Sequence, residues 1–237
     1  VNDLLIHDAV TFNAAGSSAS APSIQTNGKQ TYNGAETLLA NTVLTNTGAG
    51  KIWAKNTIDG GFGLSVNTAG FTEFDQAIGS ATPLASLATD APGTTDLNGG
   101  LITTTDAQSF GDAVVLSANT QLNAGGKVWF QNTVNGGFSL AVDSSGVTEF
   151  DNTVGSLNPL TSLTTDAPGS TDLNGGLVIT TGVQTFNDPV VLSADAHLVA
   201  GGKVWFKNTL DGAFALAIDT ASQTEFDQAV GATTPLA

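Results

Sequence analysis

The sequence predicts an all-β fold, a parallel β-helix built from stacked coils of about 20 residues. Three observations lead to this prediction. Turn residues are abundant, with 28 glycines, and charged residues make up only 11% of the chain. Short runs of alternating apolar and polar residues are separated by Gly, Asn or Asp, and long segments recur along the chain. No apolar period of 3.6 residues extends far enough for a helix.

Composition and charge exclude several classes of function. The 237-residue chain has a formal net charge of −15, and its six basic residues are all lysines. Nucleic-acid binding needs basic residues that displace counterions from phosphate, so we expect no nucleic-acid partner. No apolar run approaches the roughly 18 residues of a membrane span. Without cysteine the chain has no disulfide framework and no thiolate metal site.

Internal repeats divide the chain into three parts without a linker. Residues 86–161 and 162–237 are both 76 residues long and align without a gap. The segment TDAPGTTDLNGG at 89–100 returns as TDAPGSTDLNGG at 165–176. Residues 1–85 form a more diverged copy, in which 14–23 are predicted to be an inserted loop. We therefore expect one continuous stack of three repeats, with about four coils each.

Each copy holds short predicted strands such as LVIT, VVLSA and KVWF. They are too short and too numerous for an ordinary sandwich, and they suit coils that pair with the coils above and below. Val, Leu, Ile and Phe then point inward, and Lys, Thr, Gln and Asp point outward. The alternative is a row of small tandem β-sandwiches with strand exchange, in which VNDLLIHDAVTF is donated to a neighbouring subunit.

Two repeated segments are predicted corners of the coil, Asn98-Gly99-Gly100 and Asn174-Gly175-Gly176. We expect the glycines to take positive φ. We expect each asparagine side chain to stack on an asparagine of a neighbouring coil in a ladder. The segment recurs because the same corner is turned at the same place in every copy.

The three tryptophans and three of the six lysines occupy one repeated position. In KVWF, inward Val and Phe would turn Lys and Trp outward. Four coils at ~4.8 Å each would space the tryptophans by ~19 Å along one side of the stack. Such a row suits lateral packing between fibres or stacking on sugar rings. Alternatively, this face packs on the chain's own inserted loop, or Trp points inward and Phe outward. The predicted contact surface comprises Trp53, Trp129, Trp205, Lys51, Lys127 and Lys203.

No catalytic site is predicted, because a catalytic site needs convergent groups that are not repeated. His7 and His197 occupy different phases of the repeat and have no repeated acidic partner. The TEFD segments place two carboxylates roughly 7 Å apart along a strand, a spacing compatible with glycosidases. Three copies without any arginine favour a solvated acidic stripe instead. These pairs are Glu73/Asp75, Glu149/Asp151 and Glu225/Asp227.

Four aspartates in turns rich in Gly and Asn are candidate calcium ligands, since they offer hard oxygen atoms. They are Asp90, Asp96, Asp166 and Asp172. The G-G-x-G-x-D nonapeptide of calcium-binding β-rolls is absent, as is the EF-hand spacing. Capping of turns is the favoured interpretation, and no cofactor is expected.

The segments SLTTDAPGSTDLNGG, GVQTFNDPVVLSAD and TEFDQAVGATTPLA resemble repeats of very large bacterial exported proteins. These are the β-strand-repeat proteins akin to filamentous haemagglutinin and to autotransporter adhesins. The resemblance covers essentially the whole chain and rests on composition and period. It implies a fibrous β-helical stalk that is secreted or exposed at the cell surface.

Two hypotheses of function follow. In the first, the chain is a structural subunit or segment of an extracellular bacterial filament that assembles head to tail with itself. Asp8 matches Asp90 and Ala237 is the last residue of a copy, so we expect the segment to start and stop almost in phase with the repeat. Uncapped strand edges invite continuation. In the second, the chain is an adhesin stalk that binds glycan or a partner surface through the repeated Trp and Lys positions and loop 14–23. An enzyme acting on polysaccharide is the least favoured hypothesis.

Overall fold

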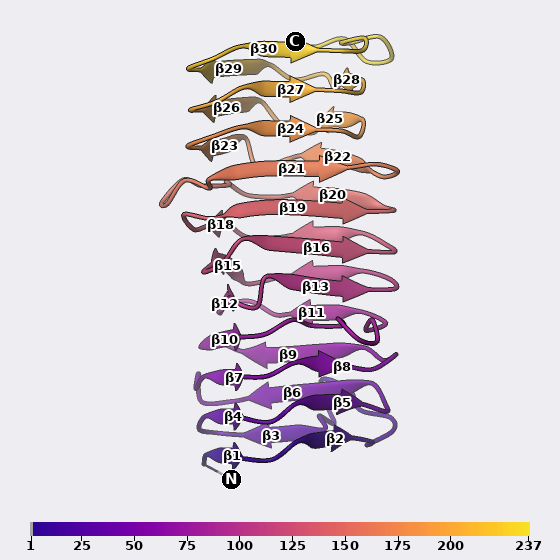
Figure 1. Ribbon diagram of the computed structural model, residues 1–237, viewed down its shortest axis with the longest axis vertical. Helices are drawn as coiled ribbons and strands as arrows, with labels where there is room; N and C mark the ends of the chain where they lie inside the picture. Colours follow the sequence, from indigo (N-terminus) through magenta and orange to yellow (C-terminus); the bar gives the residue numbers. More distant parts are fainter. Residues whose placement is uncertain (1) are drawn as a thin grey trace.

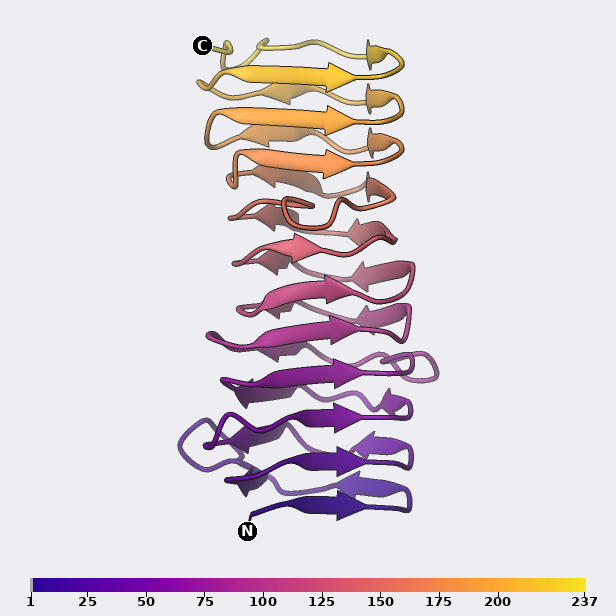
Figure 2. The same cartoon turned by 90° about the vertical axis from the view of Figure 1, so that its left-hand side faces the viewer.

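The computed structural model describes residues 2–237 and shows one β-solenoid of eleven stacked coils (Figure 1). The N-terminus lies at one end of the stack and the C-terminus at the other. In Figure 2 the near strands all run to the right while the chain climbs from the N-terminus, so the coil is right-handed. Every regular element in residues 2–237 is a strand, so within this range no helix is available to cross a membrane.

Each coil contributes one strand position to each of three faces, and strands pair only with the coils above and below. Face 1 comprises β1 (Leu4–Ile6), β4 (Gln30–Tyr32), β7 (Ile52–Ala54), β10 (Phe71–Phe74), β12 (Thr94–Leu97), β15 (Ala113–Leu116), β18 (Val134–Asn135), β23 (Leu177–Thr180), β26 (Ala196–Ala200) and β29 (Leu216–Thr220). A single bridging residue, Val154, joins β18 to β23.

The other two faces are built in the same way. Face 2 comprises β2 (Val10–Phe12), β5 (Glu36–Leu38), β8 (Ile58–Asp59), β13 (Leu101–Thr104), β16 (Thr120–Ala124), β19 (Ser139–Ser144), β21 (Ser162–Asp166), β24 (Gln184–Phe186), β27 (Val204–Phe206) and β30 (Thr224–Phe226), with Ile78 bridging β8 to β13. Face 3 comprises β3 (Ile24–Thr26), β6 (Thr42–Asn46), β9 (Leu64–Thr68), β11 (Leu87–Thr89), β14 (Gln108–Phe110), β17 (Val128–Phe130), β20 (Val147–Phe150), β22 (Ser170–Leu173), β25 (Val190–Leu192) and β28 (Leu210–Asp211), followed by Val230.

The predicted parallel β-helix is therefore confirmed, and the alternative of tandem sandwiches is wrong. A sandwich needs antiparallel sheets, whereas neighbouring strands such as β10 and β12 pair in parallel. Alternation sets the burial: in β16, β26 and β9 the side chains are in turn buried and half-buried along the strand. Parallel pairing of equivalent residues stacks like on like, because a rung lies about 4.8 Å from the next.

Stacked aromatic rings fill part of the core. The rings of Phe110, Phe130 and Phe150 lie on successive rungs of face 3, with centroids 5.2 and 5.0 Å apart. The same residues of the next repeat, Phe186, Phe206 and Phe226, stack on face 2 at 4.9 and 5.1 Å. Equivalent residues of successive repeats thus lie on different faces.

The sequence repeat and the structural coil are out of step. The tryptophan strands β7, β17 and β27 are equivalent in sequence, but they lie on faces 1, 3 and 2. One repeat spans eleven strand positions, which is three and two-thirds turns instead of four. Each copy is therefore rotated by two faces relative to the preceding copy, and three copies return the chain to its first face.

The predicted positive φ is found at the second glycine of each corner but not at Gly99 or Gly175, and the asparagines act differently from the prediction. Gly100 and Gly176 have φ of 72° and 74°, and a Cβ at Gly99 would lie 2.1 Å from the carbonyl oxygen of Gln76. Only glycine fits such a corner. The asparagine ladder was wrong: Asn98 donates instead to Asp75 of the coil below, at 3.4 Å. Rotation of the copies puts Asn98 and Asn174 at different corners, so they cannot stack.

Candidate functional site

Five side chains from three coils form a cluster on face 1, which we call the clasp. Lys51 and Trp53 lie on or beside β7, Glu73 and Asp75 on or beside β10, and Asn98 follows β12. The Trp53 Nε1–H donates to Asp75 at 2.8 Å, and Lys51 pairs with Glu73. The register explains these contacts, because Trp53 lies directly opposite Glu73 in the parallel ladder.

Lysine ammonium groups cover the tryptophan ring of the first clasp. The Nζ atoms of Lys51 and Lys55, which flank Trp53 in the strand, both lie 3.8 Å from the ring centroid. This cation–π geometry is attractive, and it places charged groups where a sugar ring or a neighbouring fibre would stack. The indole is half-buried and bonded within its own chain.

The second clasp repeats the first on face 3. Trp129 donates to Asp151 at 2.7 Å, Asn174 donates to Asp151 at 3.2 Å, and Lys127 pairs with Glu149. Lys127 also lies 4.0 Å from the Trp129 ring centroid.

The third clasp, on face 2, is incomplete. Lys203 pairs with Glu225 and lies 3.5 Å from the Trp205 ring centroid. The Nε1 of Trp205 is buried without a hydrogen-bond partner. Asp227 is exposed, and residues 2–237 place no asparagine in contact with it. In the other two clasps that asparagine comes from the following coil.

The electrostatics of the clasp are set by burial and by the lysine. Burial raises the pKa of Glu73 and of Glu149 above its ordinary value, and the paired lysine opposes this shift. At Asp151 burial also raises the pKa, but hydrogen bonds from its neighbours, including Trp129, outweigh it and leave the pKa below its ordinary value. The carboxylates are therefore held in a polar network inside the chain.

Each clasp thus brings together one lysine and one tryptophan of the predicted contact surface, but the three clasps lie on three different faces. The outward orientation of Trp and Lys is confirmed, since Val128 and Phe130 are buried on either side of Trp129. The row of Trp53, Trp129 and Trp205 along one side is wrong. The tryptophans fall on different faces because each repeat is one-third of a turn short of four coils. Whether Lys51, Lys127 and Lys203 contact another molecule stays a prediction.

The four candidate calcium ligands do not converge. Asp90 accepts from the Thr68 backbone at 2.9 Å, and Asp166 caps the Ala167 N–H at 2.9 Å, as expected of turn residues. Asp96 and Asp172 lie opposite Glu73 and Glu149 in the ladders. Across residues 2–237 no three acidic or histidine side chains are placed to hold one metal ion.

The two histidines lie far apart in the stack, at opposite ends. His7 contacts Asn33 at 3.2 Å and is exposed, and His197 on β26 contacts Asp219 at 2.9 Å. A serine–histidine–carboxylate hydrolase needs a serine beside the imidazole, and within residues 2–237 neither histidine makes a hydrogen bond to a serine.

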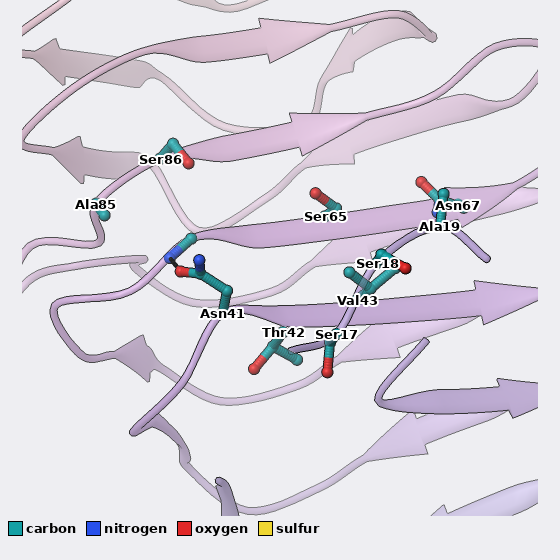
Figure 3. Close-up of a pocket in the computed structure, with 11 residues that line it drawn as sticks. Ser17, Ser18, Ala19, Asn41, Thr42, Val43, Ser65, Asn67, Ala85 and Ser86 are labelled. Atoms are coloured by element: carbon teal, nitrogen blue, oxygen red, sulfur yellow. Dashed lines mark hydrogen bonds between the residues drawn. The ribbon is translucent and has the colours of Figure 1, made fainter. Parts of the chain in front are cut away.

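The inserted loop forms a groove against face 3. Residues 13–23 connect β2 to β3 and lie beside β6 and β9 (Figure 3). The hollow has a volume of about 440 Å³ and is lined by hydroxyl, amide and small side chains, without a charged residue. The polar lining includes Ser17, Ser18, Asn41, Ser65, Asn67 and Ser86.

Sequence reasoning missed three buried acids. Glu36 on β5 is 1% exposed, and neither carboxylate oxygen has a hydrogen-bond partner. Asp112 and Asp188 are equally buried but accept hydrogen bonds, from Thr95 at 2.8 Å and from Thr165 at 2.6 Å. The signal was available for Glu36, because the other two copies have Val114 and Val190 at this position.

Comparison of the chain with protein-family models, with curated proteins and with solved structures found no match in any of the three.

Proposed function

We propose that this chain is a structural segment of an extracellular bacterial filament or surface fibre that extends by head-to-tail stacking. One observation carries the proposal: both ends of the solenoid present open parallel strands. At the C-terminal end Phe226 and Val230 are each 42% exposed, although their equivalents Phe150 and Val154 are buried. At the N-terminal end Leu4 and Ile6 are only partly buried against the core.

Open parallel strands carry unpaired N–H and C=O groups, which pair readily with another strand. Solenoids that end in water normally cover these edges with a capping element. Within residues 2–237 no helix covers either end, and loop 13–23 lies along the side of the stack toward β6 and β9. The ends are thus suited to continuation by another coil.

The remaining features suit a structural role. Eleven coils at about 4.8 Å give a rod about 53 Å long per chain, with backbone hydrogen bonds that run along its axis. A net charge of −15 favours solubility of such rods, and the repulsion between like charges opposes their packing side by side. The resemblance to bacterial exported β-strand-repeat proteins supports a location outside the cell.

Assembly is tested by electron microscopy and light scattering of the 237-residue protein at increasing concentration, in buffer of physiological ionic strength. We expect unbranched filaments one solenoid wide. Phe226→Asp should abolish them, because it places a charge in the end contact. Leu157→Asp is the matched control, since Leu157 is 86% exposed in the middle of the stack. A monomer at every concentration, for the unaltered chain, contradicts the proposal.

The second candidate is a stalk that binds a neutral glycan, and the groove beside loop 13–23 favours it. Hydroxyl and amide side chains suit the hydroxyls of a saccharide, and the lining has no charge. The clasps support this function less well, because lysines cover their tryptophan rings. Saccharide binding that is lost when loop 13–23 is shortened, in a chain that forms no filaments, would favour this candidate.

A further inference from the structure

The incomplete third clasp indicates which strand completes it. In the first two clasps the asparagine follows the strand that pairs with the TEF strand: β12 pairs with β10, and β22 pairs with β20. The equivalent strand for β30 has to lie on face 2. Strand β2 lies on face 2 at the N-terminal end, and Asn13 follows it directly.

The equivalence of β2 with β12 rests on register. Phe12 pairs with Leu38 of the next coil as Leu97 pairs with Leu116, and both Phe12 and Leu97 are buried. Asn13 therefore occupies the place of Asn98. From these observations we infer that a second copy of this chain stacks on the β28–β30 end with its β1–β3 end. In that arrangement Asn13 of the second copy binds Asp227 and completes the third clasp.

The other two faces fit the same arrangement. On face 1, β29 is equivalent to β9, which pairs with β11 through Leu64 and Leu87. By the same register β29 receives β1, with Leu216 opposite Leu4 and Ile218 opposite Ile6. All four side chains are apolar and partly buried against the core, so stacking would bury them fully.

On face 2, bridges join Ile78 to Ile102 and Leu84 to Thr104. The residues equivalent to Ile78 and Leu84 at the C-terminal end are Val230 and Leu236, which belong to face 3. The equivalent contacts across the junction are Val230 with Ile24 and Leu236 with Thr26. A hollow of about 190 Å³ lies at this end, lined by Leu4 and residues 23–26. Leu236 of one copy would come to lie against this hollow of the next.

All three faces agree only because three repeats make eleven whole turns. After one or two repeats the next strand would fall on face 3 or on face 2, and only after three repeats does it fall on face 1, where the stack began. A 237-residue unit therefore presents, at one end, the three strands that its other end requires in the same order. Stacking then needs translation along the axis and the ordinary twist of the sheet, but no rotation from face to face.

The junction deepens the proposed function, because it presupposes stacking and fixes its register. The chain has no cysteine, so every disulfide that forms in a variant comes from the introduced cysteine pair. Across the junction, Glu225 should lie opposite Thr11 on face 2, and Ala217 opposite Leu5 on face 1. Opposed Cα atoms on neighbouring rungs are about 4.8 Å apart, within the range of a disulfide.

The experiment uses four double variants of the whole chain under mild oxidation. Glu225→Cys is combined with Thr11→Cys or with Leu5→Cys, and Ala217→Cys is combined with Leu5→Cys or with Thr11→Cys. We expect disulfide-linked ladders from the two matched pairs, at least about tenfold more than from the mismatched pairs. All four positions are exposed or half-buried on the outer surface, so each variant should fold.

The outcomes separate the junction from the wider proposal. Filaments whose matched and mismatched pairs cross-link equally would overturn the register and leave the fibre proposal intact. Chains that never assemble would overturn both. Because each chain carries a charge of −15, the experiment is run at 0.15 M salt, where charges farther apart than about 8 Å are largely screened.

Discussion

Replacing Glu36 by valine should stabilise the N-terminal coils, and more strongly as the pH rises. Glu36 points into the core between Val10 and Ile58 of the neighbouring rungs. Burial raises its pKa from 4.5 to about 8. The folded chain therefore holds a proton that the unfolded chain releases, so stability is lost as the pH rises from about 4.5 to about 8.

The size of the effect follows from the shift. Each pH unit inside that window costs about 1.4 kcal/mol, so the loss at pH 7 is about 3 kcal/mol relative to pH 4.5. Glu36→Val removes the whole loss, and it also removes a buried polar group without a partner. Glu36→Gln is the control: it should remove the pH dependence but stay less stable than Glu36→Val.

The assay is urea unfolding at pH 5 and pH 8, with hydrogen exchange over β4–β6 as the local measurement. A local measurement is needed because terminal coils of a solenoid can unfold before the rest. Tyr32, the one tyrosine of the chain, is fully buried in the same coil and gives an optical signal. If Glu36→Val lost as much stability between pH 5 and pH 8 as the unaltered chain, Glu36 would not be the group responsible.

Two further predictions concern the clasp and the core. Asp151→Ala should cost about 1–2 kcal/mol in urea unfolding, because the half-buried Trp129 N–H loses its acceptor; the exposed Asp143→Ala is the control, and equal effects of both would contradict a structural role for the clasp. Phe130→Ala should cost about 3–5 kcal/mol, because it opens a gap between Phe110 and Phe150 in the ring stack; a loss below about 1 kcal/mol in calorimetry would show that the stack contributes little.

The fold could be predicted because its determinants are local. Alternation over three to five residues and glycine at fixed places define a short strand and a corner, and both recur in every coil. The direction of Trp129 also followed from the alternation alone. These features depend on neighbours in the chain and not on partners 20 residues away.

The arrangement of the clasps could not be read in the same way. The 76-residue repeat predicts four coils of about 20 residues, although its last segment, 223–237, is only 15 residues long. In the structure it supplies two strand positions, β30 and Val230, and after the equivalent segment 147–161 the third position, β21, comes from the next repeat. The short segment was the signal that one turn is shared between copies.

Pairing across coils was likewise outside the reach of local patterns. Lys51 and Glu73 meet because β7 and β10 are stacked in one register, and a slip of one residue would turn Glu73 inward.

The most direct test of the account is the axial repeat of the assembled material, measured by electron cryomicroscopy or fibre diffraction. Eleven coils per chain at about 4.8 Å predict a strong meridional reflection at that spacing and a rise of about 53 Å per chain. Density for Asn13 beside Asp227 at each junction would complete the third clasp. Beads without a 4.8 Å reflection, or a rise that is not eleven times the coil spacing, would contradict the account.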